Sequence, residues 1–233
     1  MSAPGPSTAP GPSVPGLRER KKQRTRDALV RVALELFTTQ GYERTTVDEI
    51  VEAVEVSQRT FFRYFSSKEE VAFAVQRMVE EEFVRALAAR PPEEGPFDAM
   101  RNAVLASWDG VGDAIDEVVP VELYLRTFFM IESTPALLAA HLRRSSEMEE
   151  TIARLVALRE GLDVDADPRP RIAVAAFSGV MRVTGQMWGK GPDRTLKGIR
   201  ELTEWYLDHL GPALSLHWRE PPARDRGRTE SGA

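Results

Sequence analysis

The stretch from residue 45 to residue 68 constrains the fold more than any other part of the chain. Thr46 and Glu49 form an S/T-x-x-E capping box, in which each side chain can satisfy a free amide at the start of a helix. Apolar residues at helical spacing follow between positions 47 and 54. Ser57, soon after them, is a favourable N-cap for a second helix. The pattern predicts two short helices joined by a tight turn.

The second of these helices, predicted over residues 58–65, has a polar outer face. Phe61 and Phe65 are four residues apart and should point to the core, so five side chains remain on the other faces: Gln58, Arg59, Thr60, Arg63 and Tyr64. Paired hydrogen bonds let Gln read adenine and Arg read guanine, and hydroxyl groups suit phosphate oxygens. A helix-turn-helix with such a second helix fits the major groove of DNA.

The distribution of charge favours the same interpretation, although the net charge of −5 does not. Residues 17–68 carry +3 and the rest of the chain −8, and residues 17–31 hold seven basic and two acidic side chains. A local basic surface is what a phosphate backbone attracts. We interpret the basic stretch that includes Arg24 as a phosphate-contacting arm; the alternative is an ordinary solvated helix start.

Further helices are expected around this segment. A brace helix is predicted from Lys21 to Gln40, with Gly41 as its C-terminal stop. A second capping box at Ser67-Lys68-Glu69-Glu70 opens a helix predicted to run from 67 to 89, and its N-terminus with Lys68 is a candidate phosphate anchor.

The remainder of the chain also has a helical pattern, so the predicted fold class is all-α. We expect an N-terminal three-helix bundle with the helix-turn-helix and a larger C-terminal helical domain for ligand binding and dimerisation. The predicted divisions are a disordered arm at 1–16, the DNA-binding domain at 17–66, the ligand and dimerisation domain at 67–218, and a disordered tail at 219–233.

The larger domain contains very apolar segments. A helix is predicted over 97–109, followed by a stretch broken at Gly110, Gly112 and Pro120. The segment 121–131 is either a buried helix or a pocket wall. A helix capped by Thr134-Pro135 should run to Glu160. Residues 171–188 are apolar on most sides, which indicates burial against both a pocket and a partner. The candidate ligand-binding residues are Trp108, Tyr124, Phe128, Phe129, His141, Phe177 and Met181. A hydrogen-bonded core role is the alternative for His141.

Several functional classes lack support in the sequence. There is no cysteine, and the three histidines lie near no nucleophile motif. We expect no catalytic residue, no metal site and no cofactor. No apolar run of about 18 residues predicts a membrane span, and no secretory signal is evident. A cytoplasmic location is therefore expected.

Short segments between residues 25 and 72 together resemble the N-terminal domain of the TetR family of bacterial transcriptional regulators. They are Ala33-Leu34-Glu35-Leu36-Phe37, Gly41-Tyr42, Thr45-Thr46-Val47-Asp48-Glu49-Ile50, Val56-Ser57, Phe61-Phe62-Arg63-Tyr64-Phe65 and Lys68. The resemblance implies phosphate contacts at Thr46 and Lys68 and a reading helix that starts at Ser57. The complete predicted DNA-contacting set is Arg24, Arg44, Thr46, Ser57, Gln58, Arg59, Thr60, Phe62, Arg63, Tyr64 and Lys68.

Three positions depart from the family pattern. Glu55 replaces the usual turn glycine, so the turn either bears strain or uses another geometry. Arg59 replaces a second common glycine and adds a charge facing the groove. Phe62 stands where a tyrosine is usual and cannot donate a hydrogen bond to a phosphate.

The resemblance also implies a function and partners. A homodimer formed through helices at about 170–188 and 193–210 would bind a palindromic double-stranded operator, and a small apolar ligand would release it. The helix from Thr134 to Leu162, with Met187-Trp188-Gly189 after it, is similar to members with an acyl-CoA-type ligand domain, although no phosphate-binding loop accompanies it. The alternatives are a DNA-binding regulator without a small ligand, and an enzyme.

Overall fold

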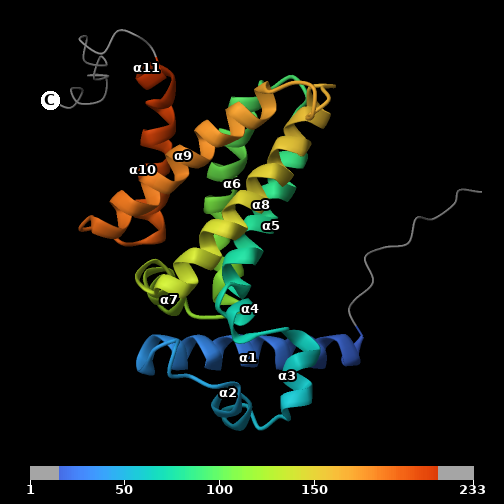
Figure 1. Ribbon diagram of the computed structural model, residues 1–233, viewed down its shortest axis with the longest axis vertical. Helices are drawn as coiled ribbons and strands as arrows, with labels where there is room; N and C mark the ends of the chain where they lie inside the picture. Colours follow the sequence, from blue (N-terminus) through green and yellow to red (C-terminus); the bar gives the residue numbers. More distant parts are fainter. Residues whose placement is uncertain (1–15, 215–233) are drawn as a thin grey trace, which may run out of the picture. The chain divides into compact units, whose positions relative to one another are not determined.

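The computed structural model describes residues 16–214, and that part of the chain is helical with no strand (Figure 1). The predicted tail at 219–233, and the predicted arm at 1–16 except Gly16, lie outside the described residues. The helices are α1 Leu17–Gln40, α2 Val47–Ala53, α3 Gln58–Tyr64, α4 Lys68–Ala72, α5 Ala74–Ala88, α6 Pro96–Asp116, α7 Val121–Ser133, α8 Pro135–Arg159, α9 Arg169–Lys190, α10 Leu196–Asp208 and α11 Leu210–Leu214. None of these helices is both long enough and apolar enough to cross a membrane.

The chain forms two compact units, the first ending at Ala74 and the second beginning at Val75. The sequence placed the division between 66 and 67, and that functional boundary stays a prediction. The first unit contains α1 to α4. The long helix α1 packs against α2 and α4 and contributes the fully buried Leu29, Leu34 and Phe37 to their common core. The brace helix is therefore present, and it begins at Leu17 rather than at Lys21.

The continuous helix predicted from 67 to 89 is wrong, because the structure breaks it at Phe73 into α4 and α5. Phe73 has φ −96° and ψ 5°, and its N–H caps α4 by donating to the carbonyls of Glu69 and Val71. Residues 71–75 are all buried. Five consecutive residues point to every side of a regular helix, so this segment is enclosed all round, and the break lies inside it.

The breaks predicted at Gly110 and Gly112 are also wrong, whereas the one at Pro120 is present, because Pro120 precedes α7. Helix α6 continues through Gly110 and Gly112 to Asp116. Val111 and Ile115 extend its buried face, and their burial offsets the roughly 0.5–1 kcal/mol that each glycine costs in a helix. A Cβ atom at Gly112 would lie 3.6 Å from Leu196, which shows how closely α6 approaches the start of α10.

The second unit is built around one apolar cluster that α5, α6, α8, α9 and α10 share. Phe177 of α9 lies at its centre, stacked on Phe83 at 5.8 Å and edge-on to Phe97 at 6.3 Å between ring centres. Helix α9 packs against α8 on one side and α10 on the other (Figure 1). The buried face of α9 is therefore the face that carries Phe177.

Several predicted helix ends shift. Gly189 belongs to α9 rather than to the following turn, and the last predicted helix, 193–210, is divided into α10 and α11. Pro135 begins α8 as predicted, but the Thr134 side chain makes no capping hydrogen bond.

Candidate nucleic-acid interface

The capping box that opens α2 has the predicted hydrogen bonds. The backbone N–H of Glu49 donates to the Thr46 hydroxyl at 3.2 Å, and the Thr46 N–H donates to a Glu49 carboxylate oxygen at 2.7 Å. The bonds from the Thr46 backbone and hydroxyl lower the pKa of Glu49 below its ordinary value. The start of α2 is thus fixed by local contacts, with Thr46 exposed.

The turn between α2 and α3 uses a left-handed residue. Glu55 has φ 56°, and it is the one non-glycine residue with positive φ among residues 16–214. The backbone N–H of Val56 donates to Val51 O at 2.9 Å, which closes the turn. Of the two geometries that the sequence left open, the turn therefore takes the strained one, with a side chain where glycine would be relaxed.

Helix α3 presents the predicted polar face. Phe61 and Phe65 are buried, whereas Phe62 is 53% exposed. Ser57 caps the helix, because the Thr60 N–H donates to its hydroxyl at 3.2 Å, and the two hydroxyls lie 3.0 Å apart in a mutual hydrogen bond. Arg59 is exposed and has no hydrogen-bond or ion-pair partner within the described part of the chain. This guanidinium is available to an external partner.

Two other side chains of the reading face contact protein groups. The Gln58 side-chain amide nitrogen donates to the carboxylate of Asp48 on α2. The Arg63 guanidinium lies 5.0 Å from the centre of the Tyr64 ring and donates to its hydroxyl at 3.4 Å. Asp48 is not among the residues predicted from the sequence, because its closeness to Gln58 depends on how the turn folds.

Lys68 contacts the loop that follows α1. Its ammonium nitrogen donates to Tyr42 O at 2.9 Å and to Thr45 O at 3.2 Å, and it lies 4.3 Å from the centre of the Tyr42 ring. Burial, with Glu69 and Glu43 nearby, raises the pKa of Tyr42 to about 12. The phosphate contact expected of Lys68 stays a prediction. In the structure, Lys68 also stabilises the loop after α1 through its bonds to the Tyr42 and Thr45 carbonyls.

The capping pattern at the start of α4 differs from the predicted box. Ser67 accepts from the Glu70 N–H at 3.1 Å, as predicted. The Glu70 carboxylate bonds to Ser66, through its backbone N–H at 2.6 Å and its hydroxyl at 2.8 Å, rather than to the Ser67 backbone. The Glu70 carboxylate therefore holds the Ser66 N–H, while the Ser67 hydroxyl caps the start of the helix.

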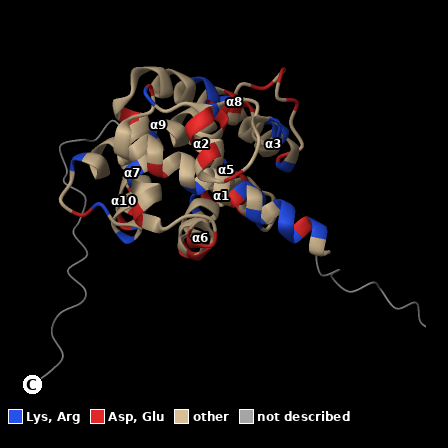
Figure 2. Ribbon diagram, turned by 90° about the horizontal axis from the view of Figure 1, so that it is seen from below, with Lys and Arg blue, Asp and Glu red and all other residues tan. Residues whose placement is uncertain are grey.

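Basic residues lie on the first turns of α1, as the blue segments in Figure 2 show. Arg24 is exposed there, and Arg44 is exposed after α1. The guanidinium of Arg26 instead lies 5.3 Å from the centre of the Phe65 ring. The positions predicted for phosphate contact on α1 and in the loop after it thus face solvent.

The candidate ligand-binding residues fall into three groups in the second unit. The first group is aromatic: Phe128 and Phe129 of α7 pack on Trp188 of α9, with ring centres 5.2 and 5.4 Å away. A Cβ atom at Gly189 would lie 3.4 Å from Phe129. These rings bring α7 into contact with the C-terminal end of α9.

The second group belongs to the apolar cluster. Phe177 is part of it, and Trp108 and Met181 pack against it. The Trp108 indole nitrogen is buried and has no hydrogen-bond partner among residues 16–214. The same is true of the hydroxyl of Thr184, which is fully buried. Thr184 was not predicted, because its spacing marks it only as one more position on the buried face of α9.

The third group is polar. His141 Nδ1 lies 3.0 Å from the side-chain nitrogen of Gln76, and Arg144 forms an ion pair with Glu80 at 3.1 Å. Burial, the largest cause, lowers the pKa of His141 and raises that of Glu80. Tyr124 is buried nearby, and burial together with Glu80 raises its pKa to about 12. Helices α5 and α8 are joined by these polar contacts; the ligand contact expected of His141 stays a prediction.

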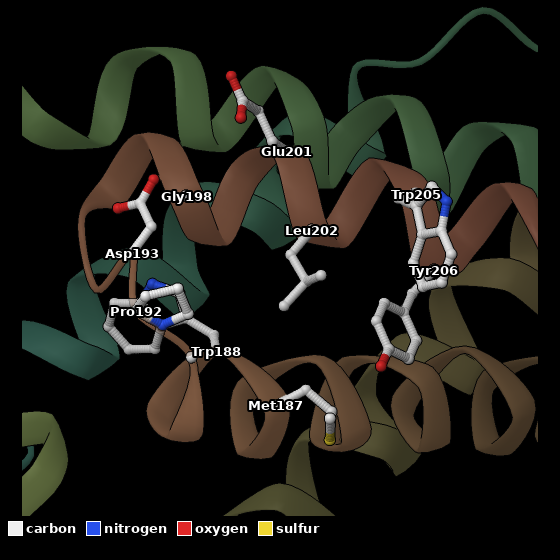
Figure 3. A pocket seen from close by; sticks show the side chains of 10 residues that line it. Met187, Trp188, Pro192, Asp193, Gly198, Glu201, Leu202, Trp205 and Tyr206 are labelled. Atoms are coloured by element: carbon white, nitrogen blue, oxygen red, sulfur yellow. The ribbon is translucent and has the colours of Figure 1, made fainter.

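A groove of about 410 Å³ lies elsewhere, between the end of α9 and α10 (Figure 3). Its lining residues are Met187, Trp188, Gly191, Pro192, Asp193, Gly198, Glu201, Leu202, Trp205 and Tyr206. Met187 and Trp205 are exposed beside it, and Ile172 and Val183 continue the exposed apolar residues along α9. This groove contains none of the candidate ligand residues. Residues 16–214 include no group of three or more acidic, histidine or cysteine side chains that could hold a metal ion.

Two family models match the chain. One, described as bacterial regulatory proteins of the tetR family, covers residues 29–75, and the other, the MftR C-terminal domain, covers residues 94–212. The chain is 49% identical over 218 residues to the HTH-type transcriptional regulator TcmR of Streptomyces glaucescens. This match covers 94% of this chain and 96% of TcmR. It is 28% identical over 95 residues to the HTH-type transcriptional repressor NicS of Pseudomonas putida, 40% of this chain and 45% of NicS. The SmeT–triclosan complex shares its fold, with a TM-score of 0.58 and 17% identity over 90% of this chain and all of that one.

Proposed function

The chain belongs to the TetR family of bacterial transcriptional regulators, and from that premise we propose that it is a ligand-responsive repressor that binds a palindromic operator as a homodimer. Its fold and its relatives are those of DNA-binding regulators and not of enzymes. The observation that carries the proposal is the exposed polar face of α3, the helix that follows the capped helix α2. A repressing rather than activating role is supported by the similarity to NicS, which is a transcriptional repressor. A cytoplasmic location belongs to the same proposal.

On DNA, α3 would enter the major groove. Gln58 and Arg59 would read base edges, Phe62 would contact a thymine methyl group or a sugar, and Arg63 and Tyr64 would lie beside the backbone. The exposed Arg24, Arg44 and Thr46, which lie outside α3, would bind phosphate. The hydroxyls of Ser57 and Thr60 and the remaining N–H of Lys68 would add to these contacts. This division separates sequence reading from sequence-independent attraction.

Dimerisation would use α9 and α10. Ile172, Met187 and Trp205 are 63%, 46% and 54% exposed, an unusual amount of uncovered apolar surface for two neighbouring helices. A second copy related by a two-fold axis would cover the same residues on both chains and close the groove of Figure 3. Two α3 helices would then be presented to two half-sites of a palindrome.

The ligand would bind among the buried aromatic residues of the second unit. The buried indole N–H of Trp108 has no hydrogen-bond partner in the described part of the chain, and such a donor costs about 1–3 kcal/mol unless something accepts from it. A small, mostly apolar molecule with a hydrogen-bond acceptor would supply that partner, with Phe177 and Met181 as apolar contacts. The similarity to SmeT, solved with triclosan, supports a compact apolar ligand, and an acyl-CoA is the narrower form of the proposal.

Release from DNA would pass through α5. Gln76 and Glu80 of this helix bond to His141 and Arg144 of α8. A ligand that favours another packing of α7 and α8 would shift these contacts and change the position of α5. The ligand then acts by stabilising one of two conformations.

A gel-shift titration with duplexes from the gene's own upstream region tests the repressor directly. We expect salt-sensitive, sequence-selective binding with two chains per palindrome, which a cell extract containing the ligand weakens. Binding without sequence preference would refute the proposal. Selective binding that no extract or acyl-CoA weakens would leave a DNA-binding regulator without a small ligand.

A further inference from the structure

The contact between Gln58 and Asp48 determines which atoms of the glutamine side chain remain available. Gln58 is the first residue of α3, and Asp48 lies in the first turn of α2, so the two short helices are joined by this hydrogen bond. Both residues are exposed on the DNA-binding unit. No other hydrogen-bond partner of either side chain is present within residues 16–214.

An ionised carboxylate only accepts hydrogen bonds. It therefore faces the NH₂ group of Gln58 and never its carbonyl oxygen, because two acceptors would repel each other. The amide is fixed in one of its two orientations, with the oxygen and the second N–H left free. The bond is charge-assisted, which makes it stronger than a contact between two neutral groups.

An amide held in this way prefers particular bases. In the major groove, adenine and cytosine present an amino group that donates to an oxygen, and adenine also presents the acceptor N7 for the second N–H. Guanine presents two acceptors, O6 and N7, which suit an amide turned the other way or an arginine. Without Asp48 the amide could turn over and serve either purine.

From this geometry we infer that Asp48 is a specificity-determining residue, which orients Gln58 to select a base pair with an outward amino group, adenine above all. The inference rests on the proposed function, since it presumes that α3 reads bases. Asp48 acts through Gln58 and is a positioning residue, without a base contact of its own.

Selection from a library of randomised duplexes, followed by sequencing, tests the inference on the full-length chain. The variants are Asp48→Ala, Gln58→Ala, their double variant and Glu52→Gln, a control that removes one exposed negative charge from the same helix. Thermal unfolding checks that each variant folds. Asp48→Asn, which keeps the side-chain size, serves where Asp48→Ala loses helix stability.

We expect the base position that loses its preference in Gln58→Ala to lose it in Asp48→Ala as well. At that position, the ratio of the dissociation constant for guanine to that for adenine should fall at least about fivefold in Asp48→Ala, with no further fall in the double variant. In Asp48→Asn this ratio should lie between those of wild type and Asp48→Ala. Glu52→Gln should keep every base preference.

Two results would overturn the inference while the proposed function stands. In the first, wild type selects a defined operator, yet Asp48→Ala changes affinity for all duplexes alike, as Glu52→Gln does. In the second, the preference sharpens in Asp48→Ala, which would mean that Asp48 competes with DNA for Gln58. If wild type enriches no sequence at all, the proposed function itself fails.

Discussion

The ammonium nitrogen of Lys68 lies 2.9 Å from the carbonyl oxygen of Tyr42 and 4.3 Å from the centre of that residue's ring. The two residues are 26 positions apart, and the contact ties the start of α4 to the loop after α1. That loop also carries Arg44 and leads to Thr46, both proposed to bind phosphate. Lys68 therefore holds part of the proposed DNA surface in place, whether or not it binds phosphate itself.

Replacing Lys68 with Met should lower the free energy of unfolding by about 2 kcal/mol, because two hydrogen bonds from a charged donor are lost. Urea denaturation measures this, with Lys68→Arg as the charge-preserving control. The salt dependence of DNA binding separates the two roles. The substitution removes Lys68 from both chains of the proposed dimer. A phosphate contact would therefore reduce the slope of log K against log salt by about 0.9 per chain, or about 1.8 per dimer, whereas a purely structural role leaves the slope unchanged.

Replacing Glu55 with Gly should stabilise the protein by about 0.5–1 kcal/mol. Glycine removes the strain of φ 56° at this turn, and part of that gain is offset by its greater freedom in the unfolded chain. Urea denaturation checks the value. Glu55→Ala removes the same charge but keeps the strain, so it should gain nothing; an equal gain there would assign the effect to charge instead.

Thr184 and Thr203 form a matched pair that tests how the hydrogen bond of a buried hydroxyl affects stability. Both are fully buried, but the Thr203 hydroxyl donates to Ile199 O at 2.7 Å, whereas the Thr184 hydroxyl has no hydrogen-bond partner between residues 16 and 214. Thr184→Val should raise the free energy of unfolding by about 1 kcal/mol, and Thr203→Val should lower it by about as much. Equal losses in both variants would show that Thr184 is satisfied in solution.

The pKa of Glu80 predicts a pH dependence. Burial raises this pKa above 4.5, although Arg144 opposes the shift. A carboxyl whose pKa is raised on folding contributes stability that is fully present below its unfolded pKa and is lost as pH rises through the folded pKa. The free energy of unfolding of Glu80→Gln, taken relative to wild type, should therefore increase as pH rises from below 4.5 towards 7. Urea denaturation of both proteins across this pH range measures the difference, and a difference that does not change with pH would contradict the prediction.

The dimer surface can be tested with a charge. Trp205→Glu places a carboxylate in the apolar surface of α10 and should convert the proposed dimer to monomer in light scattering, because an unpaired charge would be buried in the interface. Leu158→Glu is the control, since Leu158 is a 77% exposed apolar residue on α8, a helix that is not part of the proposed α9–α10 interface. A dimer that survives Trp205→Glu but not Leu158→Glu would move the interface to α8.

Local patterns identified the DNA-binding unit and most of its helices. The capping box at Thr46, the N-cap at Ser57 and the inward phenylalanines of α3 all depend on residues within four positions of each other, and the structure shows each of them. The same reasoning failed where burial overrode a local signal. The glycines at 110 and 112 did not end α6, and no breaking residue announced the interruption at Phe73.

The helical class, the helix-turn-helix and the family resemblance follow from the order of the residues alone, because periodicity and capping are short-range effects. The partners of the functional side chains become known only from the folded molecule. Gln58 meets Asp48 ten positions away, and Arg144 meets Glu80 across 64. Such contacts depend on how turns bring helices together, and chain spacing alone does not encode that geometry. For that reason the role inferred for Asp48, the orientation of Gln58, could be recognised only once the fold was known.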